Sequence, residues 1–103
     1  MIARLWSARL PAVELPAYRR HIEERVLPVL KGIEGYKGAE LLQRPDGEAI
    51  EVVVVTWWTS LDAIRAFAGN DVEHAVVADE VRPLLSAWDR RVRHYDVALR
   101  DEP

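Results

Sequence analysis

The side chains of this sequence best suited to moving a proton near neutral pH are its three histidines. His74 lies in the segment NDVEHAVV, directly after a predicted helix. Imidazole is a suitable general base near neutral pH, and His74 could remove a proton from a phenol. The alternative interpretation is a surface histidine beside Glu73. We predict His74 as the catalytic residue.

A second histidine has two interpretations. His21 lies about one helical turn from Tyr18, and this spacing allows both side chains to line a pocket. Its neighbours Arg20 and Glu24 favour instead a solvated position at the edge of a helix. The sequence leaves both open.

The third histidine belongs to a predicted strand, where His94 and Asp96 share one face. A carboxylate at this spacing could orient the imidazole for proton transfer, although the pair also fits the polar face of an edge strand. The histidines show neither an i,i+4 pair nor an HxH motif, and no glycine-rich phosphate loop is present. The sequence therefore predicts no metal site and no cofactor.

Aromatic side chains are spread over several predicted elements, and this favours either a hydrophobic core or a pocket for a planar ligand. Large rings commonly fill the core of a small domain. A pocket requires in addition a few polar groups beside the rings, such as indole N–H groups. The residues predicted to bind substrate are Trp6, Tyr18, His21, Trp58, Phe67 and Trp88.

Six main elements must position these side chains. They are a strand over 2–9, a helix over 15–31, strands over 36–44 and 49–58 joined by a PDGE turn, a helix capped by Thr59 or Ser60 and ended by Gly69, and a strand over 91–99. A further helical piece is predicted in DEVRPLLSAW. Pro28 lies inside the first helix and should bend it or tighten its last turn, and Gly32 is a candidate left-handed cap.

The order of elements, βαββαβ, predicts an α+β fold of the ferredoxin-like split βαβ type. It would contain an antiparallel four-stranded sheet with its helices on one face. We expect a single domain over residues 1–99 and a loose tail over 100–103, because 103 residues suffice for one domain only.

Both faces of the third predicted strand are apolar. Val52, Val54 and Trp58 point to one side, and Val53, Val55 and Trp57 point to the other. Helices can cover only one face, so a monomer would expose a large apolar patch. We therefore predict a homodimer whose sheets pack face to face.

Charge and composition restrict the partners further. The net charge is −3, and basic residues are interleaved with acidic ones, as in RRHIEER, so we expect neither nucleic acid nor membrane as a partner. The chain has no cysteine, which excludes disulfides and thiol catalysis. No signal-peptide pattern is visible at the N-terminus, and a cytoplasmic location is expected.

Three segments resemble the antibiotic biosynthesis monooxygenase (ABM) domain family. They are GIEGYKG (32–38), WTSLDAIRAFAGND (58–71) and RVRHYDV (91–97). The resemblance extends from Met1 to about Leu99 and implies the dimeric α/β-barrel fold, with a pocket inside each protomer between sheet and helices. The family includes cofactor-free oxygenases of aromatic polyketides and haem-degrading enzymes.

The haem-degrading branch of this family uses an Asn on the first strand, a Trp in the second helix and a His shortly after it. The resemblance places these positions on Trp6 (or Ser7), Phe67 and Val77, and none carries the required side chain. His74 lies one helical turn from Val77. A tryptophan at position 6 predicts a pocket that is narrower and more apolar than a haem cleft.

Three functions remain as hypotheses. The first is a small cofactor-independent monooxygenase that acts on a planar aromatic or polyketide-like molecule, as the resemblance implies. The second is a non-enzymatic dimeric module for small-molecule binding or stability, because no catalytic constellation is recognised in the sequence. The third is a haem-binding or haem-degrading protein.

Overall fold

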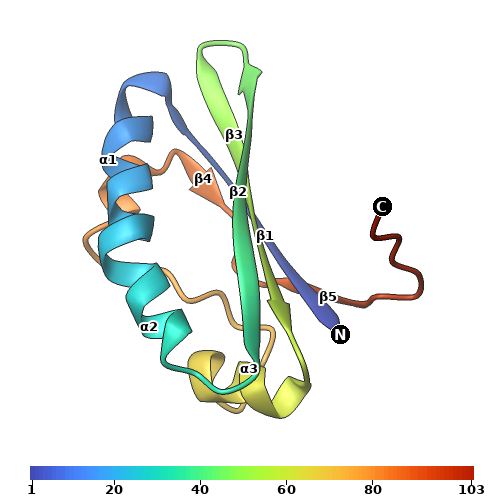
Figure 1. The fold of residues 1–103 in the computed structure, drawn as a ribbon. Helices are drawn as coiled ribbons and strands as arrows, with labels where there is room; N and C mark the ends of the chain where they lie inside the picture. The colour runs from blue at the N-terminus through green and yellow to red at the C-terminus, as the bar shows by residue number, and fades with distance from the viewer.

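Two long antiparallel strands form the centre of the sheet in the computed structural model, which describes residues 1–103 (Figure 1). The strands are β1 (Ile2–Pro11), β2 (Tyr36–Asp46), β3 (Ala49–Trp58), β4 (Ala87–Trp88) and β5 (Arg93–Asp96). The helices are α1 (Leu15–His21), α2 (Leu27–Lys31) and α3 (Leu61–Ala68). The fold is therefore α+β and ferredoxin-like, as predicted. No helix is long and apolar enough to cross a membrane.

The sheet has five strands where four were predicted. Its order is β2-β3-β1-β4, and β5 pairs with β1 as well. The last strand position of the ferredoxin-like order is thus filled by two short pieces: β4 opposite Ala8 and Arg9, and β5 opposite residues 2–5. Between them the backbone leaves β1, because the amide of Val92 donates to the carbonyl of Glu73, and the amide of Ala75 donates to the carbonyl of Arg90.

The helical piece predicted in DEVRPLLSAW is mostly absent. Only Arg82–Leu84 form a short 3-10 turn, and Ala87–Trp88 are strand. The extended backbone of Leu85 ends the turn, and the amide of Ser86 then donates to the carbonyl of Arg9 on β1. Pairing with the sheet edge therefore replaces helix in this segment.

The first helix contains a wider turn before Pro28, whereas a bend or a tighter last turn was predicted. A π-helical segment, Ile22–Val26, joins α1 to α2, and the amide of Leu27 donates to the carbonyl of Ile22, five residues earlier. Pro28 follows directly and lacks an amide hydrogen, so it fits after this widened turn. Gly32 is not the left-handed cap that was predicted, because its φ is −83°; the positive φ occurs at Gly35.

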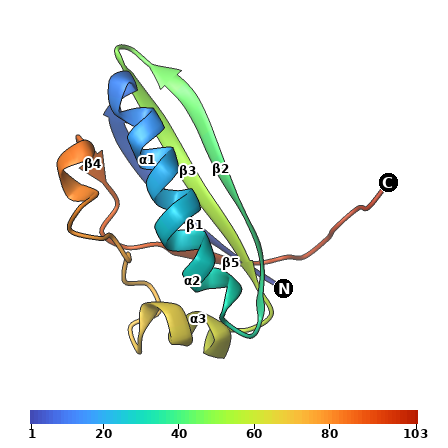
Figure 2. The same ribbon diagram turned by 60° about the vertical axis from the view of Figure 1, so that its left-hand side comes forward.

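The two adjacent tryptophans serve opposite faces of the sheet. Trp58 is fully buried on the face covered by the helices, while Trp57 is only partly buried and points to the other face. Figures 1 and 2 show α1 and α2 along one side of the sheet, with α3 at one end. The other face carries no helix.

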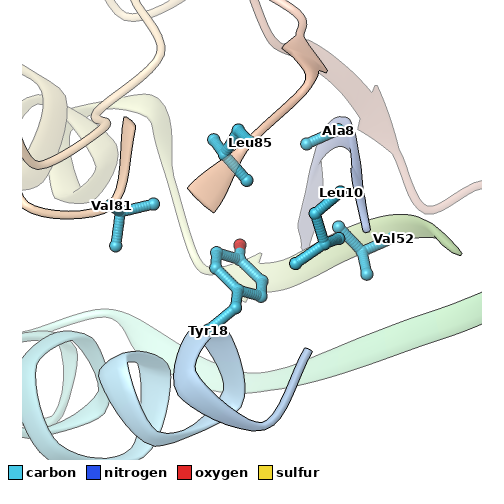
Figure 3. Packing of buried hydrophobic residues seen from close by; sticks show 6 residues of the cluster. All are labelled: Ala8, Leu10, Tyr18, Val52, Val81 and Leu85. Carbon is cyan, nitrogen blue, oxygen red and sulfur yellow. The ribbon is translucent and has the colours of Figure 1, made fainter. Parts of the chain in front are cut away.

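Two hydrophobic clusters hold the helices to the sheet. The first is drawn in Figure 3, where Tyr18 rises from α1 toward Val81 and Leu85. Its members are Ala8, Leu10, Tyr18, Val52, Val81 and Leu85. The second lies under α3 and contains Leu30, Trp58, Ala63 and Ile64. Both clusters lie on the helix side of the sheet.

Candidate ligand-binding cavity

A cavity of about 430 Å³ lies between the sheet and the helical layer, a volume within the usual range for small-molecule sites. The sheet wall includes Leu41 and Val54, and the opposite wall includes Ile22 and Val26 of the π-helical segment. The segment that follows α3 contributes Val76, Val77 and Ala78. Of the 22 lining residues 15 are hydrophobic, so the cavity suits an apolar ligand.

The widened turn of the first helix forms part of this wall. Ile22, Glu23 and Val26 all belong to the π-helical segment and line the cavity. Turns of this kind are rare, and they occur frequently at functional sites. Here the turn shapes the wall that faces the sheet.

Two polar side chains are buried in this protein, and both line the cavity. Arg4 and Thr56 are each only 5% exposed. They are direct partners in the register of β1 and β3, so their side chains lie next to each other on the helix-side face of the sheet. The other polar residues that the sheet contributes to the lining are Glu40 and Gln43 of β2, and neither is buried.

No carboxylate neutralises the Arg4 guanidinium. It donates hydrogen bonds to the carbonyls of Val72 and His74, the latter at 2.8 Å, and to Nε2 of His94 at 2.9 Å. The guanidinium also lies 5.8 Å from the centre of the Phe67 ring, within range of a cation–π contact. Burial lowers the pKa of Arg4 to about 10, so the group stays charged at neutral pH.

His94 is held in its neutral form by this contact. Its Nε2 accepts a hydrogen bond from Arg4, so Nδ1 carries the proton. Burial lowers the pKa of His94, and the charge of Arg4 lowers it further, against a smaller opposing effect of Glu73. His94 forms no hydrogen bond or ion pair with Asp96, which was one of the two interpretations of this histidine, and it contacts Arg4 instead. His94 is therefore one of three groups that hold the Arg4 guanidinium in place.

Stability should depend on pH through His94. The folded-state pKa lies below the value of about 6.5 for an unfolded chain, so the unfolded state binds the proton more readily. The contribution of His94 to the free energy of unfolding should therefore be complete above about pH 7, and it should decrease as the pH falls below about 6.5. Urea unfolding of wild type and His94→Gln between pH 5 and pH 8 measures this difference. The glutamine variant should lack this component, and parallel curves for the two proteins would contradict it.

Two further polar groups reach the cavity from α1. His21 lines it with a side chain that is 12% exposed, and its Nδ1 lies 3.5 Å from Oε1 of Glu80. Tyr18 is 2% exposed, and burial raises the pKa of its phenol, so the hydroxyl stays protonated at physiological pH. Of the two interpretations of His21, the structure supports the position at the pocket.

The structure brings together part of the predicted site. Trp6, Tyr18, His21 and Phe67 line the cavity. The indole of Trp6 also donates to the carbonyl of Asp89 at 2.7 Å, which fixes the ring beside the connection between β4 and β5.

Three predicted site residues lie outside the cavity lining. Trp58 is enclosed in the second cluster, between the rings of Tyr36 and Phe67. Trp88 lies at the sheet edge under the guanidinium of Arg90. His74 has an exposed side chain, and only its backbone carbonyl contacts the site, through Arg4. Its role as the catalytic residue stays a prediction.

Sequence reasoning missed Arg4 and Thr56. An arginine in a strand is normally a surface residue, and a threonine is a common strand former. The one available signal was their place in strands whose neighbours are apolar on both faces. A polar residue within such a run requires either solvent or a buried partner.

Comparison with known proteins supports this architecture. The family model for antibiotic biosynthesis monooxygenase matches residues 1–79. Uncharacterized protein Rv2558 of Mycobacterium tuberculosis strain H37Rv is 32% identical over 85 residues, which are 81% of this chain and 34% of that protein. Uncharacterized protein MT2635 of strain CDC 1551 matches equally. The chain thus spans about a third of the length of these relatives.

Solved structures share the whole fold at low identity. The haem-degrader MhuD of Mycobacterium tuberculosis, with two haems in its active site, has a TM-score of 0.69 and 21% identity over 99% of this chain and 100% of that one. An MhuD mutant with two manganese protoporphyrin IX molecules has a TM-score of 0.73 and 20% identity over all of both chains. A putative antibiotic biosynthesis monooxygenase from Bacillus cereus has a TM-score of 0.66 and 13% identity over 99% and 95%.

The structural matches agree in fold with the resemblance found in the sequence. The family model covers more than half of the chain, and its matched residues include β1, β2 and β3, which carry Arg4, Thr56 and the sheet wall of the cavity. This chain therefore belongs to the antibiotic biosynthesis monooxygenase family.

Proposed function

We propose that the cavity binds a planar aromatic or polyketide-like small molecule and that the protein oxidises this molecule with O₂. The observation that carries the proposal is the mostly hydrophobic cavity between the sheet and the helices, with aromatic rings from three elements along it. A cavity of this kind favours flat apolar ligands, since aromatic side chains can stack on the ligand faces. Family membership supplies the reaction class.

His21 is proposed to accept the substrate proton. It brings an imidazole to the cavity, while its Nδ1 faces Glu80. A general base positioned in this way commonly contributes about 100-fold or more to a rate. Tyr18, which stays protonated, is suited to donate a hydrogen bond to a substrate oxygen.

The two alternatives make different demands on the cavity. A non-enzymatic binding module requires the same cavity but no proton acceptor. Haem requires an axial ligand, and the positions that the resemblance assigns to the haem-degrading branch hold Phe67 and Val77, both of which line the cavity. These residues do not fit that ligand set. His21 is the one imidazole among the lining residues that could bind iron.

Anthrone is a suitable first substrate, because its oxidation needs only O₂. It takes one oxygen atom into anthraquinone, and the second oxygen leaves as water with two hydrogens of the substrate. We expect oxygen consumption above the uncatalysed rate, and His21→Ala should reduce the enzymatic rate about 100-fold. A larger loss in His74→Ala would restore the sequence-based assignment. Binding without turnover of any planar phenol or anthrone would favour the binding module.

Substitution of Trp6 tests whether its ring lines an open pocket or fills the core. Trp6→Ala should lower the melting temperature only modestly, because the ring is partly exposed, and should change the affinity for a planar phenolic ligand at least severalfold. Calorimetry and fluorescence titration measure both. A large stability loss without any change in ligand affinity would show that Trp6 is only core.

A hemin titration tests the haem alternative. A Soret band on addition of hemin that His21→Ala abolishes would favour it.

We further propose that the sheet face without helices pairs with a second copy of the chain. It carries Leu5, Val53 and Trp57, and Leu42 and Tyr95 on it are about half exposed. Sedimentation should give twice the 11.8 kDa chain mass, with roughly 2,000 Å² buried in total. Val53→Lys should yield monomers, while Val13→Lys, at an exposed site elsewhere, should not. A wild-type monomer would contradict the pairing.

A further inference from the structure

We propose that the ligand of the cavity is an aromatic acid whose carboxylate is bound by the buried pair Arg4 and Thr56. The inference rests on the proposed function, since it concerns the same cavity, and it defines the chemical class of the ligand. Neither an apolar cavity nor family membership requires an acidic group on the ligand. The requirement comes from two residues of the sheet wall.

The first step is the charge of Arg4. A cation that is 5% exposed is costly to bury unless an anion lies beside it. Arg4 has no salt bridge to an aspartate or glutamate, and its three hydrogen bonds go to two carbonyls and a neutral imidazole. These partners solvate the guanidinium and leave its net charge in place. A ligand carboxylate would supply the missing negative charge.

The second step is the donor beside it. The Thr56 hydroxyl accepts a hydrogen bond from Nε1 of Trp58 at 2.8 Å. Because one of its lone pairs is occupied in this way, its own hydrogen is available to donate elsewhere. Thr56 is the direct cross-strand neighbour of Arg4. The pair therefore presents a guanidinium and a hydroxyl donor on one wall, which matches the two oxygens of a carboxylate.

The third step concerns competing acids. Glu23 lines the cavity, but it forms an exposed ion pair with Arg19 on the same helix. Glu40 also contributes to the lining, but it lies in register with Val55, on strand positions that point away from the helices. Neither acid contacts Arg4. The cation of the sheet wall is thus left for the ligand.

A structural role for Arg4 is the competing interpretation. Its bonds to the carbonyls of Val72 and His74 attach the segment after α3 to the sheet. A purely structural arginine would give the cavity no preference for charged ligands. The two interpretations therefore differ in a measurable property of the wild-type protein, and that property can be tested without any substitution.

The test compares 2-naphthoate with 2-naphthamide, which share one ring system and differ in charge. Titration of the wild-type protein at pH 7.5, followed by calorimetry, should show that the acid binds at least about tenfold more tightly than the amide. Arg4→Gln should bring the two affinities within about twofold, and Arg4→Lys should keep part of the preference. Arg20→Gln is the matched control, because it removes the same charge from an exposed position on α1 outside the cavity lining and should leave the ratio unchanged.

Each outcome has a definite meaning. Equal binding of both probes to the wild type, or a tenfold preference that survives in Arg4→Gln, would overturn the inference and leave the cavity as a binding site. Binding of neither probe would count against the proposed function and the inference together. If Arg4→Gln does not fold, the ratio of the two affinities in the wild type and in Arg4→Lys decides. A ratio near one in the wild type, or a ratio that Arg4→Lys leaves unchanged, would reject the carboxylate site.

Discussion

Trp58→Ala is expected to lower the free energy of unfolding by about 3–5 kcal/mol. Trp58 is fully buried, its ring packs edge-on against Tyr36 at 5.5 Å and stacks with Phe67 at 6.1 Å, and its indole donates to Thr56. Truncation leaves a cavity in the cluster beneath α3 and removes the hydrogen bond that orients the Thr56 hydroxyl. Calorimetry should record a fall of more than about 12 °C in the melting temperature.

Trp88→Ala is the matched control for this substitution. Trp88 lies partly buried at the sheet edge, where it contacts Arg90 at 4.8 Å. Loss of a partly exposed ring removes less buried area, so the cost should be well below that of Trp58→Ala. Equal losses in the two variants would mean that Trp58 is not the centre of the second cluster.

Gly35→Ala is expected to destabilise the fold by about 3 kcal/mol or more. The φ of Gly35 is +97°, which strains any residue with a Cβ. The added methyl would also lie 2.6 Å from the Cβ of Ala63 and 2.7 Å from Oγ1 of Thr59. The carbonyl of Gly35 accepts a hydrogen bond from the amide of Thr59 at 2.9 Å, so a shift of the loop would disturb the start of α3. Urea unfolding measures the loss.

Gly47→Ala separates backbone strain from crowding. Gly47 also has a positive φ, +63°, in the turn between β2 and β3, but nothing lies within 4 Å of the position of an added Cβ. We expect a cost of only about 1 kcal/mol, from strain alone. If Gly47→Ala and Gly35→Ala cost the same, the contact with Ala63 and Thr59 contributes nothing.

Local patterns in the sequence predicted most of the helix-and-strand order. The strand and turn signals around PDGE gave β3 with its observed bounds. Thr59 and Ser60 were both predicted as possible caps of the next helix, and the Ser60 side chain accepts from the amide of Ala63. Each of these features depends on residues close in the chain. The alternation of β3 also placed Trp57 and Trp58 on opposite faces of the sheet. Which of the two faces the helices cover became known only from the structure.

Features that depend on distant residues were not predictable. The division of the last strand position depends on backbone hydrogen bonds between the segments 73–75 and 90–92. The burial of Arg4 depends on carbonyls 68 and 70 residues away and on an imidazole 90 residues away. Sequence patterns report local periodicity and composition, and they contain no information on such partners.

The π-helical turn has a consequence for the phase of the first helix. Four inward residues, Tyr18, Ile22, Val26 and Leu30, recur every fourth position. In a regular α-helix each residue turns by about 100°, so twelve residues would rotate Leu30 about 120° away from Tyr18. The wider turn absorbs about one residue, which reduces this offset to about 20°, and both side chains are buried. The helix thus behaves as one that carries a single inserted residue. Pro28→Ala alone would not remove the wider turn, because the four-residue repeat of inward side chains also requires that turn.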